Sequence, residues 1–242
     1  MGVILITGAS SGIGRATAQA FLGAGWQVGL LARRRQALEA VAEGHEEALI
    51  LPADVTDLAA MQGAVAALVA RFGRLDALFN NAGIFAPQGT IDEIDPEDWA
   101  ASLAVNLTGM FNAARVAFGQ MRSQVPQGGR IINNGSISAH SPRPGSVCYT
   151  TTKHGVTGLT RTLSLDGRPF DIAAGQIDIG NARTPLLESV AEGAQALGQE
   201  EPPIMEVEDV ARAVLYMASL PPGANVQSMT VMATKMPFVG RG

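Results

Sequence analysis

Short apolar runs alternate with longer segments of helical periodicity from the first residues of the sequence to about residue 232. This alternation is typical of repeated βα units around a parallel sheet. It predicts seven strands, near residues 2–7, 26–32, 47–52, 75–80, 130–134, 170–177 and 226–232. It also predicts six helices, over residues 12–25, 34–44, 56–73, 97–124, 148–166 and 206–219. We therefore expect an α/β fold in three layers, with a seven-stranded parallel sheet between two layers of helices.

Turn residues mark several predicted boundaries. Gly25 and Gly44 fit the C-terminal stops of helices, and Pro96 fits a first helical turn. No linker rich in Ser, Gly or Pro, no internal repeat and no charge run divides residues 1–242, so a single domain is expected. The least regular stretch, between Ile177 and Met205, is rich in small and polar residues, and we interpret it as a substrate lid.

Composition narrows the classes of partner. Hydrophobic residues make up 47% and charged residues 16% of the sequence, as in an ordinary globular protein. The formal net charge of -5 gives no general attraction to phosphate backbones or anionic lipid, which argues against nucleic acid and membranes as partners. The segment Met1–Ile6 lacks the basic region of a signal peptide, and no apolar run approaches the roughly 18 residues that span a bilayer. We expect a cytoplasmic protein.

Metal-ligating patterns are not found in the sequence. Cys148 is the single cysteine, which excludes an intramolecular disulfide and a cysteine-based zinc cluster. His45, His140 and His154 have no metal-ligand spacing, so no metal is expected. We interpret Cys148 as a small buried hydrophobic residue and His140 as an ordinary loop histidine, although a position facing the substrate stays open for His140.

A glycine-rich turn, TGASSGIG at residues 7–14, follows the first predicted strand and opens a helix. Glycines at these positions allow a tight turn and a close approach of the backbone to a pyrophosphate, while free N–H groups at the helix start attract the anion. A Walker-type phosphate loop is excluded because no Gly-Lys-Ser/Thr follows. The turn predicts a dinucleotide site, although a purely structural turn remains open on this motif alone.

Four further elements occur in a fixed order along the chain. They are NNAG at residues 80–83, Asn106 within Val-Asn-Leu, YxxxK from Tyr149 to Lys153, and Glu-Asp-Val-Ala at residues 208–211. Together with the TGxxxGxG spacing, they resemble the short-chain dehydrogenase/reductase family over essentially the whole chain. The resemblance implies a doubly wound Rossmann fold and an oxidoreductase that moves a hydride between a nicotinamide and a carbonyl or secondary alcohol.

The predicted catalytic residues are Ser136, Tyr149, Lys153 and Asn106. Tyr149 and Lys153 lie four positions apart on a predicted helix, so both side chains emerge on one face, and a nearby ammonium favours the phenolate that a base requires. The substrate oxygen needs a hydrogen-bond donor, and Ser136 has the spacing from Tyr149 that is usual in the family, with Ser138 as the alternative. The resemblance implies that Lys153 also binds the nicotinamide ribose and that Asn106 holds a water of a proton relay.

Three arginines, residues 33–35, end the second predicted strand, where an NAD site usually has an acidic residue. Arginine binds a 2′-phosphate through a charge-assisted fork, so NADP is favoured over NAD, with Arg33 as the principal residue and Arg34 as its helper. The alternative is that the arginines form a solvated surface at a helix start.

The resemblance supplies the remaining cofactor positions. Asp54 and Val55 are placed beside the adenine, and Thr184 over the nicotinamide carboxamide. The chain has Ile179-Gly180 where the family commonly has Pro-Gly, which we expect to make this connection less rigid. The full predicted set of cofactor-binding residues is Gly8, Ser10, Ser11, Gly12, Ile13, Gly14, Arg33, Arg34, Asp54, Val55, Asn81, Ala82, Gly83, Tyr149, Lys153, Ile179, Gly180 and Thr184.

Assembly and alternative functions follow from the same resemblance. A homodimer or homotetramer is implied, through the helices at residues 97–124 and 148–166. The alternatives are a dinucleotide sensor or scaffold without turnover, an NAD-preferring alcohol dehydrogenase, and a sugar-nucleotide epimerase or dehydratase. The intact catalytic set argues against the first, and the short chain after the last core helix argues against the last. The substrate-facing segments, residues 84–96, 139–147 and 177–205, do not predict a substrate.

Overall fold

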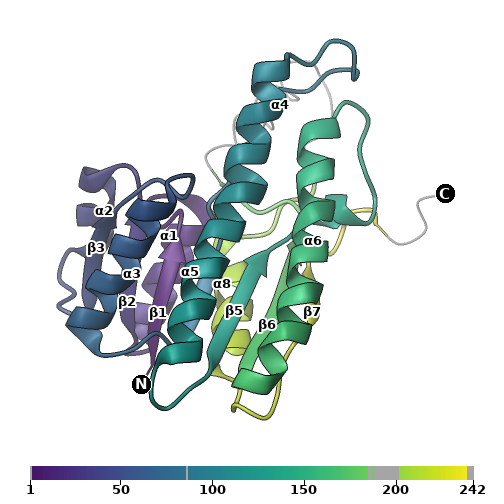
Figure 1. Cartoon of the computed structure of the whole chain (residues 1–242). Coiled ribbons are helices and arrows are strands. Elements are labelled where there is room, and N and C mark those ends of the chain that lie inside the picture. The colour runs from purple at the N-terminus through teal and green to yellow at the C-terminus, as the bar shows by residue number, and fades with distance from the viewer. Residues whose placement is uncertain (1, 86, 185–186, 188–201, 239–242) are drawn as a thin grey trace.

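The computed structural model of the protein describes residues 2–85, 87–184, 187 and 202–238. Seven parallel strands form its sheet in the order β3-β2-β1-β4-β5-β6-β7 (Figure 1). Their bounds are β1 Val3–Thr7, β2 Gln27–Ala32, β3 Ala48–Pro52, β4 Ala77–Asn80, β5 Gly129–Asn134, β6 Ile172–Ile179 and β7 Ser228–Val231. The predicted Rossmann-type fold with a seven-stranded parallel sheet is therefore confirmed.

Helices connect these strands. The α-helices are α1 Gly12–Gly23, α2 Arg35–Ala42, α3 Leu58–Phe72, α4 Pro96–Leu103, α5 Met110–Ser123, α6 Val147–Gly167 and α8 Val207–Ser219. A π-helix, η1 Ala104–Gly109, joins α4 to α5, and two short 3₁₀ turns are η2 Ile137–Ala139 and η3 Arg168–Phe170. In Figure 1, α4 and α5 follow one another along one line, and α4 extends beyond the sheet beside the start of α6.

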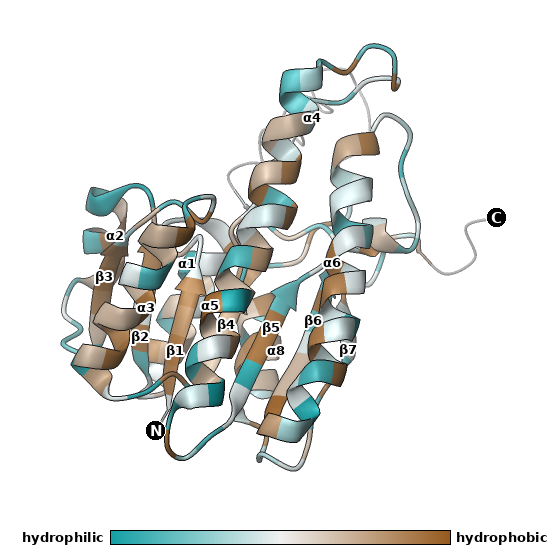
Figure 2. Ribbon diagram, viewed as in Figure 1, coloured by the Kyte–Doolittle hydropathy of each residue, from teal (hydrophilic) through white to brown (hydrophobic). Residues whose placement is uncertain are grey.

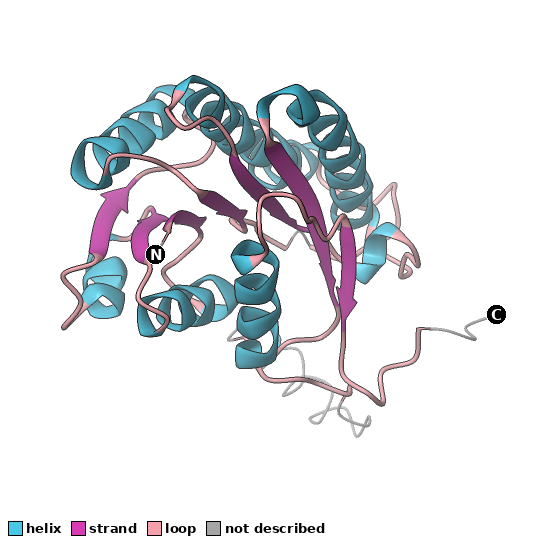
Figure 3. Ribbon diagram, turned by 90° about the horizontal axis from the view of Figure 1, so that it is seen from below, coloured by secondary structure: helices cyan, strands magenta, loops and turns pink. Residues whose placement is uncertain are grey.

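Helices cover both faces of the sheet because parallel strands are buried on both sides (Figure 3). On one face, α1, α2 and α8 pack on the strands around Phe21 and Val214, and on the other, α3 and α5 pack around Leu68 and Ala117. All five residues of β1 are buried. Figure 2 shows the strands as largely hydrophobic, whereas the tip of β5 is hydrophilic, where it ends in Asn133 and Asn134. The core is thus apolar up to the carboxyl edge of the sheet and polar there.

The order of the strands reverses beside β1. It pairs with β2 on one side and with β4 on the other, both in parallel. The connections that leave β1 and β4 therefore run to opposite faces of the sheet, and they leave a crevice between them at the carboxyl ends of these strands. In such sheets this crevice is the ordinary ligand site.

The predicted boundaries agree with the structure to within a few residues, with two informative differences. The expected strand 170–177 is β6 Ile172–Ile179, because residues 168–170 form a 3₁₀ turn first and Asp171 then takes a left-handed conformation at φ 54°. The expected continuous helix 97–124 is interrupted by η1, whose turn contains Asn106. Gly25 and Gly44 follow α1 and α2 with φ of 78° each, as predicted for helix stops.

The predicted substrate lid, residues 177–205, falls largely outside the described residues. Its first part is the end of β6, and Ala182 forms a parallel bridge with Met205 that joins the two described ends of the segment. Within the described part of the chain, no helix is long and apolar enough to cross a membrane.

Strand β5, in the interior of the sheet, provides a test of core packing. Ile132 is fully buried, whereas Ile91 is 77% exposed. We predict that Ile132→Ala lowers the free energy of unfolding by about 2–5 kcal/mol, because a cavity remains where the side chain was removed. The matched Ile91→Ala should change it by less than about 0.5 kcal/mol. Urea denaturation of both variants measures their free energies of unfolding. Equal effects of the two substitutions would contradict the burial of Ile132 in the core.

Candidate active site

The glycine-rich turn joins β1 to α1 at the crevice. Gly8 and Gly12 have φ of 69° and 50°, which favours glycine at both positions. A Cβ on Gly14 would lie 2.2 Å from the carbonyl oxygen of Gly8, so only glycine lets the helix approach the turn this closely. Ser11 makes no side-chain cap hydrogen bond to the first turn of α1 among the described residues. The first N–H groups of the helix are therefore available to an anion.

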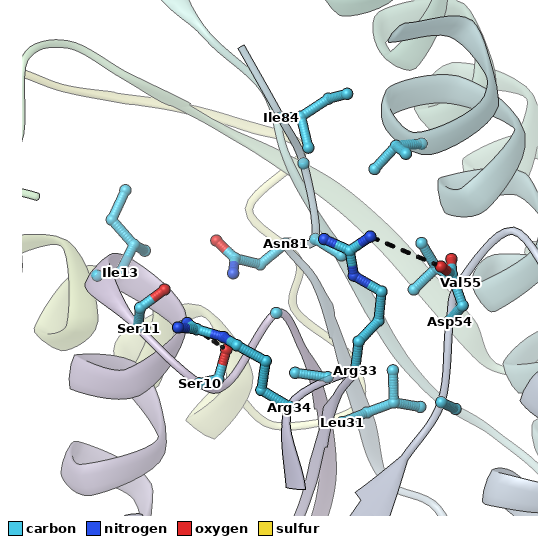
Figure 4. A pocket seen from close by; sticks show the side chains of 18 of the residues that line it. Ser10, Ser11, Ile13, Leu31, Arg33, Arg34, Asp54, Val55, Asn81 and Ile84 are labelled. Carbon is cyan, nitrogen blue, oxygen red and sulfur yellow. Dashed lines mark hydrogen bonds and ion pairs between the residues drawn. The ribbon is translucent and has the colours of Figure 1, made fainter. Parts of the chain in front are cut away.

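A cavity of about 560 Å³ lies over this turn (Figure 4). Fourteen of the predicted cofactor-binding residues line it: Gly8, Ser10, Ser11, Gly12, Ile13, Gly14, Arg33, Arg34, Asp54, Val55, Asn81, Ala82, Gly83 and Thr184. Leu31, Ala32, Ala53, Ile84, Phe85 and Val105 line it as well and were not predicted. Of the other predicted residues, Ile179 is buried at the end of β6, and a Cβ on Gly180 would lie 2.8 Å from that of Met232.

Two exposed arginines stand at the rim of the cavity (Figure 4). Arg33 Nη1 lies 4.0 Å from Asp54 Oδ2, and Arg34 Nη2 donates to Ser10 Oγ at 3.3 Å. Asp54 Oδ1 accepts from the backbone N–H and the hydroxyl of Thr56, and these bonds together with Arg33 hold the pKa of Asp54 below its ordinary value. Arg34 thus reaches across to the phosphate-binding turn, and Arg33 faces the predicted adenine side.

The hydroxyl of Thr7 joins the end of β4 to the end of β1. Thr7 Oγ1 accepts from the backbone N–H groups of Asn81 at 2.8 Å and of Ala82 at 3.0 Å. The Asn81 side chain donates to Thr7 O at 3.0 Å and accepts from Asn134 Nδ2 at 2.8 Å. Asn134 O in turn accepts from Lys153 Nζ at 2.7 Å. These contacts connect the phosphate-binding turn to the predicted catalytic lysine.

The structure brings Ser136, Tyr149 and Lys153 together at the end of β5 and the start of α6. The Ser136 hydroxyl forms a hydrogen bond with Tyr149 that favours the phenolate, and Lys153 Nζ lies 5.4 Å from the centre of the Tyr149 ring. Ser138 was the alternative to Ser136, but its backbone N–H donates to Ser136 Oγ at 3.1 Å. Ser136 is therefore the serine that contacts Tyr149.

Burial shifts both titrating groups in the same sense, towards their neutral forms. Desolvation lowers the pKa of Lys153 to about 8 from its ordinary 10.5, and Asp178 opposes this shift. Desolvation raises the pKa of Tyr149 and Asp178 raises it further, whereas Ser136 and Arg143 oppose the rise. In the absence of a ligand, the tyrosine is therefore a protonated phenol at neutral pH.

Asn106 lies in the π-helix and holds the loop after NNAG. Its Oδ1 accepts from Ile84 N at 2.7 Å, and its Nδ2 donates to Ile84 O at 2.8 Å. A π turn frequently marks a functional position because it changes the backbone hydrogen bonding of a helix. Both polar groups of the Asn106 side chain are engaged by Ile84, so its side chain positions the loop in this structure.

Phe85 is a residue of the site that the sequence reasoning missed. Its ring stacks on that of Tyr149, with centroids 4.6 Å apart and planes 10° from parallel, although the side chain is 58% exposed. Stacking of two aromatic rings is favourable beyond the apolar area that it buries. The place of Phe85 two residues after NNAG was the only sequence signal.

Cys148 and the histidines have other surroundings. Cys148 is buried, as interpreted from the sequence. Within the described residues, no group of three or more His, Cys, Asp or Glu side chains lies close enough to hold a metal ion. His140 lies in the turn after η2, as expected for a loop histidine, and its Nε2 lies 2.9 Å from Oδ2 of the buried Asp178. This contact was not predicted from the sequence.

Comparisons with known proteins agree with this geometry. A model of the short chain dehydrogenase family matches residues 2–195. The chain is 33% identical over 238 residues to sulfoacetaldehyde reductase of Chromohalobacter salexigens, with 96% of this chain and 94% of that protein covered. It is 32% identical over 229 residues to trans-4-hydroxycyclohexanecarboxylate dehydrogenase of Sinomonas cyclohexanicum, with 90% and 85% covered. The crystal structure of 3-ketoacyl-(acyl-carrier-protein) reductase from Brucella melitensis complexed with NADH has a TM-score of 0.85 at 28% identity, with 95% and 96% covered.

The strand order and the glycine-rich turn at the switch point define a dinucleotide-binding α/β oxidoreductase. Within that class, the chain belongs to the short-chain dehydrogenase/reductase family. The family predicted from the motifs is therefore confirmed, and so is the class of enzyme, an NAD(P)-dependent oxidoreductase of alcohol and carbonyl groups.

The buried lysine gives a direct test of the electrostatics. Lys153 and Lys235 are the two lysines of the sequence, so ¹³C-labelled lysine yields two Cε signals, which Lys235→Arg assigns. We predict that the Lys153 signal titrates with a midpoint of about 8, because burial disfavours the ammonium. The folded protein is then stabilised as pH rises from about 8 to about 10.5, since the unfolded chain binds the proton more tightly there. A midpoint above about 10 would contradict the enclosed site.

Proposed function

We propose that the protein is an NADP-dependent oxidoreductase that moves a hydride between the nicotinamide and a carbonyl or secondary alcohol, with Tyr149 as the general acid or base. The observation that carries this proposal is the meeting of Ser136, Tyr149 and Lys153 beside Phe85, which stacks on Tyr149 and lines the cavity. A protein that only senses dinucleotides has no need of a tyrosine whose pKa, raised by burial, is lowered in part by a neighbouring serine and whose ring centre lies 5.4 Å from the ammonium of a buried lysine.

The residues that line the cavity fit an NADP molecule. The turn of Gly8, Gly12 and Gly14 leaves room for a backbone approach to the pyrophosphate, and Arg33 and Arg34 offer cations where a 2′-phosphate would lie. The sequence has no acidic residue at positions 33–35 to repel that phosphate. NAD is the rival cofactor, and the Brucella structure was determined with NADH.

The proposed reaction follows from the charges around Tyr149. A nicotinamide cofactor, when bound in this cavity, would supply or accept the hydride. In reduction, the Ser136 hydroxyl donates a hydrogen bond to the substrate oxygen, and the neutral phenol of Tyr149 gives its proton to that oxygen. In oxidation, the Tyr149 phenolate takes the proton of the alcohol, and the positive charge of Lys153 favours that phenolate. Thr184 and the loop held by Asn106 keep the site in place at its edges.

We infer that substrates with a carboxylate or sulfonate should be tested first. Arg143 is exposed, its Nη2 donates to Asn181 Oδ1 at 3.1 Å, and its charge is felt at the Tyr149 hydroxyl. A cation whose charge acts on the Tyr149 hydroxyl suits an anionic substrate. The names of two relatives refer to such compounds, sulfoacetaldehyde and trans-4-hydroxycyclohexanecarboxylate.

We also propose a homo-oligomer that uses the helices expected from the sequence. Phe111 on α5 is 49% exposed and Leu165 on α6 is 57% exposed, so apolar side chains face outward on both helices. A second copy of the chain is the partner that the family resemblance implies for this face.

The arginines can be tested without knowing the substrate. We predict that NADPH binds more tightly than NADH, and that Arg33→Ala weakens NADPH binding by about 10- to 100-fold with little effect on NADH, because a charge-assisted bond to the 2′-phosphate is lost. Arg34→Ala should act in the same direction but less strongly. Fluorescence titration with NADPH and NADH measures both constants.

Arg35→Ala is the matched control for these variants. Arg35 follows Arg33 and Arg34 in the sequence, but its side chain pairs with Glu39 on α2 at 3.7 Å. Its removal should therefore leave the ratio of NADPH to NADH affinity unchanged. If NADH binds as tightly as NADPH in the unaltered protein, the NADP assignment is wrong. Oxidation of alcohols with NAD is then the activity to test.

Tyrosine chemistry has its own control in this chain. Tyr149 and Tyr216 are its two tyrosines, and Tyr216 is 57% exposed on α8. We predict that Tyr149→Phe lowers kcat by about 10²- to 10⁴-fold while NADPH still binds, because the proton donor is removed. Tyr216→Phe should retain full activity. A panel of carbonyl compounds that carry a carboxylate or sulfonate is screened first, and kcat of each variant is then measured by steady-state kinetics with a compound that the unaltered protein reduces. A fully active Tyr149→Phe protein would disprove the role assigned to Tyr149.

A further inference from the structure

Asp178 is a buried carboxylate that the proposed reaction does not use. Asp178 is fully buried in β6, one position before the strand ends at Ile179. Oδ1 accepts from the backbone N–H of Ser136 at 2.9 Å and from Gln176 Nε2 at 2.7 Å, and Oδ2 lies 2.9 Å from His140 Nε2. A charge removed from water is strongly unfavourable unless several hydrogen bonds satisfy it, as they do here.

We propose that Asp178 is a positioning residue of the active site, whose buried carboxylate fixes the backbone of Ser136 and the ring of His140 and holds a negative charge beside Lys153 and Tyr149. The proposal rests on the proposed function in one respect, that Ser136 and Tyr149 are the reacting side chains. It assigns His140 as the partner of the carboxylate on the more exposed side, since the His140 side chain is 42% exposed and that of Asp178 only 1%.

The backbone before Ser136 is shaped around this carboxylate. A Cβ on Gly135 would lie 2.1 Å from Asp178 Oδ1 and 2.7 Å from Gln176 Nε2. Glycine is therefore the residue that lets the chain pass against the charged group at this point. The same segment donates the Ser136 N–H to the carboxylate, so the end of β5 and the end of β6 fit each other only with an acceptor of this size at position 178.

A buried polar network supports the carboxylate from the strand side. Gln176 Nε2 also donates to Thr157 Oγ1 at 3.0 Å, and Gln176 Oε1 accepts from Thr160 Oγ1 at 3.2 Å. Thr160 Oγ1 accepts from Asn133 Nδ2 at 2.8 Å. The network links β5, β6 and the catalytic helix α6, and it orients the amide of Gln176 towards Asp178. A network in which the polar groups find partners is rigid, and it fixes one geometry for the loop that carries Ser136.

The charge of Asp178 acts on both titrating residues of the site. It favours the ammonium of Lys153 and disfavours the phenolate of Tyr149, and it opposes Arg143 at the tyrosine. The charged or titratable groups around Lys153 are thus Tyr149 on its own helix and Asp178 on β6, with His140 behind the carboxylate. Removing the charge of Asp178 should change the titration of Lys153, which a purely structural role would not.

The experiment is the ¹³C titration of Lys153 in Asp178→Asn. Asparagine has nearly the same size and retains an oxygen that accepts from Ser136 N–H, but it carries no charge. We expect the Lys153 midpoint to fall by about one pH unit from its value in the unaltered protein. Asp166→Asn is the matched control, because Asp166 is exposed and lies on α6, the helix that carries Lys153. It should leave the Lys153 midpoint unchanged. An unchanged midpoint in a folded Asp178→Asn protein would overturn the proposal.

His140→Ala keeps the test decisive if Asp178→Asn does not fold. It removes the partner of Oδ2 from a partly exposed position, so the carboxylate is less compensated. The Lys153 midpoint should then move upward, opposite to the effect of Asp178→Asn, and no movement or a downward one counts against the assigned role of His140 and Asp178.

Kinetics separates this inference from the proposed function. For a substrate that the protein turns over, Asp178→Asn should lower kcat about tenfold or more because a neutral amide holds the Ser136 backbone and the His140 ring less firmly than the carboxylate does, while the dissociation constant of NADPH stays within about twofold. If no dinucleotide binds and no carbonyl is reduced, the proposed function fails, but the Lys153 titration still decides the placement of Asp178. If turnover is normal in Asp178→Asn, only the positioning role fails.

Discussion

The side chain of Thr7 makes the contact on which the site depends. Its hydroxyl accepts two backbone N–H groups from the end of β4, at Asn81 and Ala82, and so joins the two strands between which the chain order reverses. A parallel sheet leaves the carboxyl ends of its strands without partners, and these ends need such side-chain acceptors where water is excluded. Because β1 and β4 are held at this point, the glycine-rich turn, the NNAG loop and Asn134 share one fixed frame.

Polar residues of the sheet are concentrated at the same edge. The strands are apolar through their middle, and Asn80, Asn133, Gln176 and Asp178 come only where β4, β5 and β6 end. Their hydrogen bonds form a continuous buried layer between the hydrophobic core and the proposed catalytic side chains, from Asn80 through Asn133 and Thr160 to the carboxylate of Asp178. Such a layer stabilises a single arrangement because each amide that turns away leaves a buried group unpaired. Helix α6, which carries Tyr149 and Lys153, contacts this layer through Thr160.

Much of the fold and the dinucleotide site could be predicted because they depend on local rules. Glycine at positive φ and an apolar strand buried on both faces leave direct marks in the sequence, as at Gly8 and in β1. Asp178 left none, because the predicted strand ended at residue 177 and placed it in a lid, whereas β6 continues to Ile179. Phe85 and the π turn around Asn106 depend on contacts between distant segments, which periodicity does not record.

The opposite shifts of the two titrating side chains follow from one cause, the enclosure of the site, and they set its resting state. Burial brings the pKa of Lys153 down to about 8 and pushes that of Tyr149 up, so burial favours the neutral form of each group. The negative charge of Asp178 opposes the effect of burial on the pKa of Lys153 and adds to the effect of burial on the pKa of Tyr149. The resulting balance keeps an ammonium beside a protonated phenol near neutral pH, which is the state from which the proposed carbonyl reduction would start. Oxidation of an alcohol requires the phenolate, and therefore additional positive charge or a higher pH than the reverse reaction.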